Sequence, residues 1–211
     1  GKGQEYAYFP KGLLILGLFG VWMITQFFAT VSSRLGLSEK LSSQKRWVRV
    51  LEYLFVIVIM AAGLLVRLYV LNWIAIPPKA DYKTYYEIAQ LLHEGTLQKA
   101  GKGYCDYIAM FPHVLGYAFI LSKLFGFTGV SVSAGLYLNV FFSMGTVFII
   151  YKIGRKVGGR IAGLIALVGC AFWPSQVIYI NILSAEYSFT FFLYASVWLF
   201  LSLVMDYGAE S

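Results

Sequence analysis

Charged residues are scarce in this sequence. They make up 13% of its 211 residues, whereas a soluble domain carries about a quarter. Hydrophobic residues account for 59% and are gathered into long runs. This combination excludes an ordinary soluble domain and predicts an all-α, polytopic membrane protein.

Motifs of common soluble enzymes are also missing. No phosphate-cradling glycine loop, His/Cys metal cluster or Ser-His-Asp arrangement stands out. There are two cysteines, one predicted outside the membrane (Cys105) and one within a span (Cys170), so no disulfide between them is expected. The glycines at 154, 158, 159 and 163 would permit close helix approach, but a turn explains their spacing better.

The net charge of +7 comes from basic residues that lie between the apolar runs. Nucleic-acid binding would instead need a basic stripe on a folded surface, so no nucleic-acid partner is expected. Charge between apolar runs is typical of the signals that orient membrane helices.

Five apolar segments are long enough to cross a hydrocarbon core of about 30 Å at about 1.5 Å per residue. They cover residues 12–31, 50–71, 131–151, 161–183 and 187–205. The first is long for a cleavable signal peptide, and Arg34 follows it as a stop-transfer charge would. We therefore divide the chain into an extra N-terminal span with a basic loop (1–49) and a helical module (50–211).

The loops between spans predict the orientation of the chain. Nine of its seventeen basic residues fall in two short loops, which are expected to stay cytoplasmic. These residues are Arg34, Lys40, Lys45, Arg46, Arg49, Lys152, Arg155, Lys156 and Arg160. The N-terminus and the loop 72–130 then face outside. The sequence thus predicts a multi-pass protein of a cell membrane, and we expect a bacterial plasma membrane.

A shorter apolar run, 112–125, needs separate treatment. Its 14 residues would give about 21 Å of helix, too short to cross comfortably. If it crossed, the basic loop 152–160 would be forced outside. We expect a juxtamembrane or re-entrant helix at the outer surface.

The polar stretch "IPPKADYKTYYEIAQLLHEG" (76–95) follows the second span. Pro77 and Pro78 end that span, because proline lacks an amide donor and disfavours helix before it. Tyr85, Ile88, Leu91 and Leu92 then share one helix face, which predicts a short interfacial helix. Asp81 is either the N-cap of this helix or a carboxylate held at the membrane surface for chemistry.

These parts, in this order, resemble the GT-C glycosyltransferases, particularly the branch of protein O-mannosyltransferases and aminoarabinose lipid A transferases. "PPKADYKTYYEIAQLLHEG" is similar to the acidic motif and first juxtamembrane helix of that branch, with Asp81 in the position of its first acid. "FPHVLGYAFILSKLFG" resembles the second juxtamembrane helix. The turn "KIGRKVGGR" and the segment "WPSQVIYINILSAEY" continue the likeness, which covers roughly 50–205.

The chain departs from the family pattern in two ways. Tyr82 follows Asp81 where the family often has an acidic pair, so the chemistry would rest on one acid. Family members also have more spans and a distal donor-binding half. Those parts would come from a second chain or from a C-terminal half beyond this sequence.

The resemblance implies transfer of a sugar from a polyprenyl-phosphate donor to a lipid, glycan or protein acceptor on the outer face. Asp81 would be the general base of a single inverting displacement. The alternative is a non-catalytic membrane scaffold or lipid-binding subunit built from the same helices. Membrane lipids are partners in either case.

Four further residues are candidates for substrate binding, each with a plainer alternative. Arg67 would meet donor phosphate, or snorkel towards the interface. Glu186 would face the cavity as a second carboxylate, or cap the fifth span. Lys83 and His113 would meet phosphate, or remain solvated. Asp81, Asp106 and Glu186 offer oxygen ligands for a divalent cation, but their irregular spacing is no metal motif, so no metal or other cofactor is predicted.

The geometry expected from these assignments is specific. Asp81 should face an outward-open cavity walled by the second span, the two juxtamembrane helices and the outer ends of the fourth and fifth spans. Arg67 should approach the same cavity from one turn deeper.

Overall fold

A computed structural model describes residues 46–73, 76–99 and 102–207 of the chain. The predicted first span and the basic residues Arg34, Lys40 and Lys45 lie outside these ranges. The described part is all helical, as the composition predicted. Its elements in chain order are α3 (Arg46–Trp73), α4 (Asp81–His93), η1 (Leu97–Lys99), α5 (Lys102–Met110), α6 (Val114–Thr128), α7 (Val132–Ala171), α8 (Pro174–Ile178), η2 (Tyr179–Asn181) and α9 (Glu186–Tyr207).

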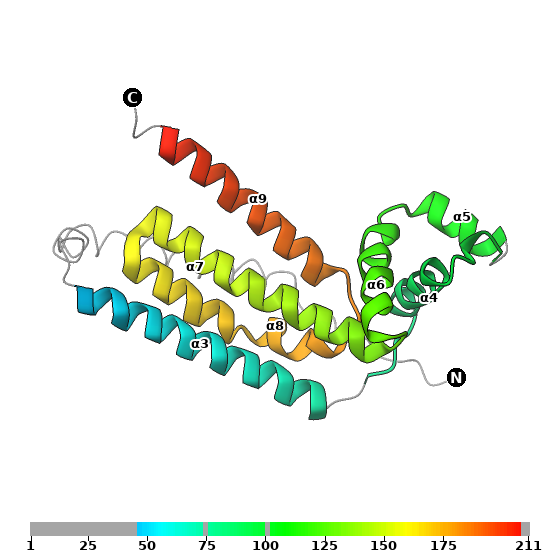
Figure 1. Ribbon diagram of the computed structural model, residues 1–211, viewed down its shortest axis with the longest axis horizontal. Coiled ribbons are helices and arrows are strands. Elements are labelled where there is room, and N and C mark those ends of the chain that lie inside the picture. The colour runs from blue at the N-terminus through cyan, green and yellow to red at the C-terminus, as the bar shows by residue number, and fades with distance from the viewer. Residues whose placement is uncertain (1–45, 74–75, 100–101, 208–211) are drawn as a thin grey trace, which may run out of the picture.

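The long helices form one bundle, and α4, α5 and α6 gather at one of its ends (Figure 1). At that end α3 finishes and both α7 and α9 begin (Figure 1). Three helices of the described part are long and apolar enough to cross a membrane, within Val48–Trp73, Val132–Ala171 and Glu186–Met205. A fourth span results if the α5–α6 pair, bent by 120°, is counted as one. The chain therefore has the helices of a multi-pass membrane protein.

Helix α7 is a hairpin of two arms that reverse at Gly159 (Figure 1). Gly159 has φ 78°, a conformation that glycine adopts without strain, so the predicted turn is confirmed. Gly154 and Gly163 face each other across the arms: a Cβ built on Gly154 would lie 3.1 Å from the Gly163 Cα. The interpretation of all these glycines as turn residues is therefore wrong for this pair, which lets the two arms touch.

The predicted span 161–183 is not one helix. The return arm of α7 ends at Ala171, and α8 and η2 follow after a break. Trp173 has an extended backbone (φ −62°, ψ 118°) because the residue before a proline avoids the helical region, and Pro174 opens α8. The break places polar residues of 174–184 beside the end of the bundle that carries α4 to α6.

Helix α4 packs its apolar face on α6. Tyr85, Ile88 and Ala89 of α4 are buried against a larger apolar set from α6 that includes Val114, Tyr117, Ala118, Leu121 and Phe125. The expectation that the apolar face of this helix rests on the membrane is thus corrected. A neighbouring helix offers an apolar face of complementary shape. Burying these side chains against it removes them from water and packs them closely.

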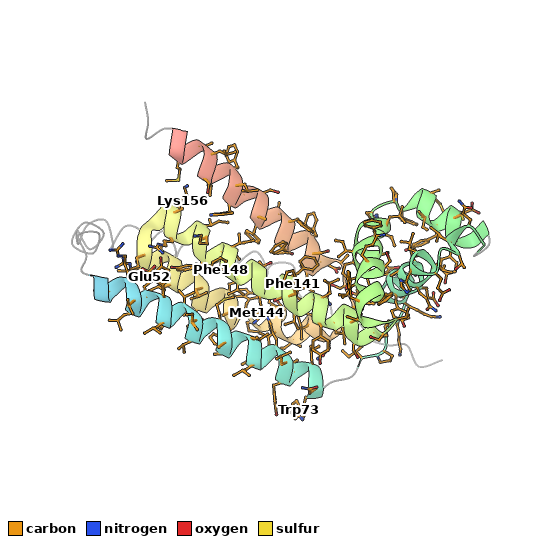
Figure 2. All side chains as sticks on the ribbon, in the orientation of Figure 1. Glu52, Trp73, Phe141, Met144, Phe148 and Lys156 are labelled. Atoms are coloured by element: carbon orange, nitrogen blue, oxygen red, sulfur yellow. The ribbon has the colours of Figure 1, made fainter. Side chains whose placement is uncertain are left out.

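The opposite end of the bundle holds a buried ion cluster. The carboxylate of Glu52, 1% exposed, lies 2.6 Å from Nε of Arg160 and 3.3 Å from Nη1 of Arg155. It also accepts a 2.7 Å hydrogen bond from the hydroxyl of Tyr151. Figure 2 shows Glu52 near the first turn of α3, beside the α7 hairpin. The cluster ties α3 to the hairpin at the end that the sequence predicts to be cytoplasmic.

Candidate functional site

Asp81 is the first residue of α4 and does not cap it. Ala80 stands at the cap position with φ 48°, and no side chain makes a capping hydrogen bond. The structure therefore does not support the N-cap explanation of Asp81. A positive φ is unfavourable for alanine, so the backbone is strained immediately before this acid.

The carboxylate of Asp81 is exposed, and the hydroxyl of Tyr107 in α5 donates to its Oδ1 over 3.4 Å. Among the described residues it makes no ion pair. Its position at a helix N-terminus favours the negative charge through the helix dipole. Asp81 is thus a carboxylate without a neutralising side chain.

Glu186 has the corresponding position in α9. It is the first residue of that helix, is exposed, and has no ion-pair partner within the described ranges. The chain therefore presents two carboxylates at the N-termini of two helices, both at the end of the bundle that carries α4 to α6 (Figure 1).

A cavity of about 410 Å³ lies beside Glu186. Its walls come from α4, from the broken segment α8–η2 and from the start of α9, and its lining residues are Tyr82, Ser175, Gln176, Tyr179, Ile182, Ser184, Glu186 and Tyr187. The hydroxyl of Tyr187 donates to the backbone oxygen of Gln176 at 3.2 Å, which joins two of these walls. Neither α3 nor α6 contributes a lining residue, so two of the expected walls are absent.

Asp81 is not among the residues that line this cavity, although its neighbour Tyr82 is. Burial raises the pKa of the Tyr82 hydroxyl, and the negative charges of Glu186 and then Asp81 raise it further. The pKa of Tyr85 is raised by the same causes in the same order. Both carboxylates therefore raise the pKa of the same two tyrosines.

Arg67 lies behind the cavity and does not line it. Its side chain is fully buried (Figure 2 shows the side chains of α3). The guanidinium donates to Ser143 Oγ at 2.9 Å and, through Nη1, to the backbone oxygens of Gly63 and Ala171 at 3.0 and 2.8 Å. Its charge acts on the hydroxyl of Tyr187, which does line the cavity. The fully buried Arg67 does not snorkel to the interface, and its Nη2 has no hydrogen-bond partner among the described residues.

The two remaining candidates lie away from the cavity. Lys83 pairs with Glu87 one turn on in α4, at 3.2 Å, and Tyr104 of α5 donates a hydrogen bond to the same carboxylate. His113 stands at the N-terminus of α6 with its ring against Phe111. Of the five candidate residues, the structure thus places only Glu186 in the cavity lining and leaves Asp81, Arg67, Lys83 and His113 outside it.

Most of the residues that line the cavity were not predicted from the sequence. Tyr82, Tyr179 and Tyr187 supply aromatic faces and hydroxyls, and Gln176 supplies an amide. A signal was present: Pro174 interrupts an apolar run, and polar residues follow it at 175, 176, 181 and 184. Glu52 was also missed, although an acid inside an apolar span demands a partner.

Among the described residues, the cavity lining holds one acid, one amide and several hydroxyls but no Lys, Arg or His. Nowhere in the described ranges do three or more His, Cys, Asp or Glu side chains gather as a metal site requires. Aromatic faces beside a carboxylate, an amide and hydroxyls suit a ligand rich in hydroxyl groups. The arrangement could hold a sugar ring and accept a proton from one of its hydroxyls.

Comparison with known proteins adds no relative. No family model matches the chain, and no characterised protein or solved structure shows significant similarity to it.

Proposed function

We propose that this chain is a membrane glycosyltransferase, or the N-terminal module of one, that uses a polyprenyl-phosphate sugar. The observation that supports it best is a cavity lined by tyrosines and by Glu186, with Asp81 next in sequence to the lining residue Tyr82. Neither carboxylate has an ion-pair partner among the described residues. Residues 50–205 also resemble segments of the GT-C glycosyltransferases and follow the same order along the chain. This resemblance supports a glycosyltransferase as well.

In this proposal Asp81 acts as the general base. An acceptor hydroxyl attacks the anomeric carbon of the donor sugar, and its proton passes to the Asp81 carboxylate. The bond between that carbon and the phosphate oxygen breaks on the opposite side, so the configuration inverts and polyprenyl phosphate leaves. The strained Ala80 holds Asp81 at the first turn of α4.

The other residues bind rather than react. Glu186 accepts hydrogen bonds from sugar or acceptor hydroxyls, and Tyr82, Tyr179 and Tyr187 supply flat faces for a sugar ring. Arg67 contributes a positive field from behind Tyr187. Lys83 would reach a donor phosphate only by leaving Glu87, and His113 would meet one at the start of α6. We place the site on the outer face of a bacterial plasma membrane, with the N-terminus outside.

The test is turnover by the purified chain in liposomes, supplied with a panel of radiolabelled polyprenyl-phosphate sugars and membrane extract as acceptor source. Asp81→Asn should lower label transfer by at least about 100-fold, the range expected for loss of a general base. Asp106→Asn, which alters an exposed acid on α5, is the matched control and should keep full activity. Equal transfer by Asp81→Asn and the unchanged chain would refute the assignment of the base.

A non-catalytic scaffold or lipid-binding subunit is the second candidate. The absence of a basic side chain from the cavity lining favours it, because a donor phosphate needs a cation. Such a subunit would transfer no label from any donor of the panel, alone or with added membrane partners, and would tolerate both Asp81→Asn and Glu186→Gln. Mass spectrometry of co-purified lipids separates the two candidates further, because only the transferase requires a bound polyprenyl phosphate.

A further inference from the structure

The chain between η2 and α9 forms part of the cavity wall without being part of a helix. We call these residues, 182–185, the linking segment. Ile182 has an extended backbone, with φ −98° and ψ 122°. Ile182 and Ser184 line the cavity, and so does Glu186, which follows the segment directly. Because the backbone of the linking segment lacks the hydrogen bonds of a helix, contacts with neighbouring helices must determine where it lies.

Asn139 of α7 makes the central contact with the linking segment. Its side chain is fully buried, and its Nδ2 donates a 2.8 Å hydrogen bond to the backbone oxygen of Ile182. Its Oδ1 accepts a 3.0 Å hydrogen bond from the hydroxyl of Tyr117 in α6. An asparagine amide has its donors on one side and its acceptor on the other, so Tyr117 determines which side faces Ile182. One side chain therefore joins α6, α7 and the linking segment.

The residues on either side of this contact are held as well. Asn181 donates through Nδ2 to the backbone oxygen of Val70 in α3, at 3.1 Å. Leu183 is buried over Gly135 of α7, where an added Cβ would overlap the leucine side chain. Three consecutive residues are thus fixed against α3 and α7. Glu186 comes three residues after Leu183, so the place of its carboxylate depends on these contacts.

Packing alone does not explain a buried asparagine at position 139. Burying an amide costs free energy unless its donors and its acceptor are paired, whereas a leucine would fill a similar volume without that cost. The amide adds a fixed direction, because a paired buried network favours one arrangement of the elements that it joins. Asn139 therefore selects one position of the linking segment against α7.

We propose that Asn139 is a positioning residue of the candidate site, which holds the linking segment so that Glu186 lines the cavity. Within the proposed function, on which this assignment rests, Glu186 binds sugar hydroxyls there. Asn139 itself does not line the cavity and acts through Ile182. Loss of its hydrogen bond should weaken substrate binding. Proton transfer to Asp81 should be unaffected, because Asp81 lies on α4, which this hydrogen bond does not involve.

The kinetics of label transfer in liposomes provide the first test. Asn139→Leu should raise the KM for the labelled donor about tenfold, the effect of losing one hydrogen bond to a charged group, and kcat should stay within about twofold. A change that only destabilised the fold would instead lower the amount of active protein, and hence the apparent kcat, at an unchanged KM. A lower kcat without a change in KM would therefore overturn the proposal.

A thiol reporter tests the position of the linking segment without any need for activity. Ser184→Cys places a thiol at a lining position that is 6% exposed, in a chain that also carries Cys105→Ser and Cys170→Ser. Adding Asn139→Leu should raise the rate of modification by a small methanethiosulfonate reagent about tenfold, because the segment opens more often. An unchanged rate would overturn the proposal. If no donor of the panel is used, the proposed function fails, and this rate still decides whether Asn139 positions the segment.

Thr146→Val is the matched control. Thr146 is also a buried polar residue of α7, but its hydroxyl donates within the same helix, to the backbone oxygen of Phe142 at 2.9 Å. Its replacement should change neither the KM nor the thiol reaction rate, and shifts equal to those of Asn139→Leu would contradict the proposal. Tyr117→Phe keeps the asparagine and removes only the hydroxyl that orients its amide, so it carries the test if Asn139→Leu does not fold. It should shift both measurements in the same direction by a smaller factor, and no shift in either would count against Asn139.

Discussion

The guanidinium of Arg67 donates a 2.8 Å hydrogen bond to the backbone oxygen of Ala171, the last residue of α7. Carbonyls at a helix C-terminus lack partners within the helix and carry the negative end of its dipole. The cation of α3 therefore stabilises the end of the return arm, immediately before the break that forms the cavity wall. Arg67 acts on the candidate site through this support.

Replacing Arg67 should destabilise the bundle. Arg67→Met removes three hydrogen bonds from a charged donor, and we expect the free energy of unfolding to fall by about 2 kcal/mol, because the desolvation cost of the buried charge offsets part of the loss. Thermal unfolding followed by tryptophan fluorescence measures the change. Arg49→Met, at an exposed position of the same helix, should have little effect. An Arg67→Met protein as stable as the unchanged chain would contradict the capping role.

Neutralising Glu52 should lower the free energy of unfolding more than the Arg67→Met change does. Glu52→Gln leaves Arg155 and Arg160 without their shared anion in a buried place, and we expect a loss of about 3 kcal/mol. The exposed Glu94→Gln should change stability by less than about 0.5 kcal/mol. The double variant Glu52→Gln with Arg160→Gln should recover part of the loss, and its failure to do so would argue against an ion-pair origin.

The α7 hairpin should not tolerate a methyl group at Gly163. A Cβ there would lie 2.9 Å from the Arg155 Cβ and 3.0 Å from the Tyr151 backbone oxygen, so Gly163→Ala should destabilise by about 1–3 kcal/mol. Gly169 is in the same arm and has no atom within 4 Å of such a Cβ. Gly169→Ala should therefore be neutral or stabilising by up to about 1 kcal/mol. The same thermal assay distinguishes the two, and equal effects would mean that the arms are not in contact.

The contact of α5 with α4 should depend on pH. The hydrogen bond from Tyr104 holds the pKa of Glu87 below its ordinary value, and Lys83 acts in the same direction. Because the folded pKa is the lower one, this stabilisation is present above the ordinary pKa of glutamate and is lost as the pH falls through the folded pKa. Tyr104→Phe should raise the pKa of Glu87, as measured by carbon NMR of labelled glutamate. Tyr107→Phe is the control, and a Glu87 pKa unchanged by Tyr104→Phe would exclude the hydrogen bond as the cause.

The orientation of the chain can be tested through Cys105, which is exposed on α5. A membrane-impermeant maleimide should label it in intact cells, because the basic loops place α5 outside. Cys105→Ser should abolish the signal, whereas Cys170→Ser should not. Labelling of Cys105 that requires a permeabilised membrane would reverse the predicted topology.

The sequence by itself determined the helical class and most of the helices. Apolar runs of membrane length and a proline pair after the second span are local signals, and so is the glycine turn at 159. The short helix after Asp81 was also predictable, because its 3.6-residue periodicity does not depend on distant partners. The helix that packs against α4 was not predictable, because an apolar face can be covered by lipid or by another helix. Only the tertiary structure shows that α6 covers it.

Only the tertiary structure decided which polar residues meet. Asp81 and Glu186 are 105 positions apart, and their shared influence on Tyr82 and Tyr85 depends on how α4 and α9 are placed. The support that Arg67 gives to the end of α7 was likewise not predictable, because Ala171 lies 104 residues away in the sequence. Interactions across such separations depend on the packing of whole helices, whereas sequence patterns report only what lies within a few turns.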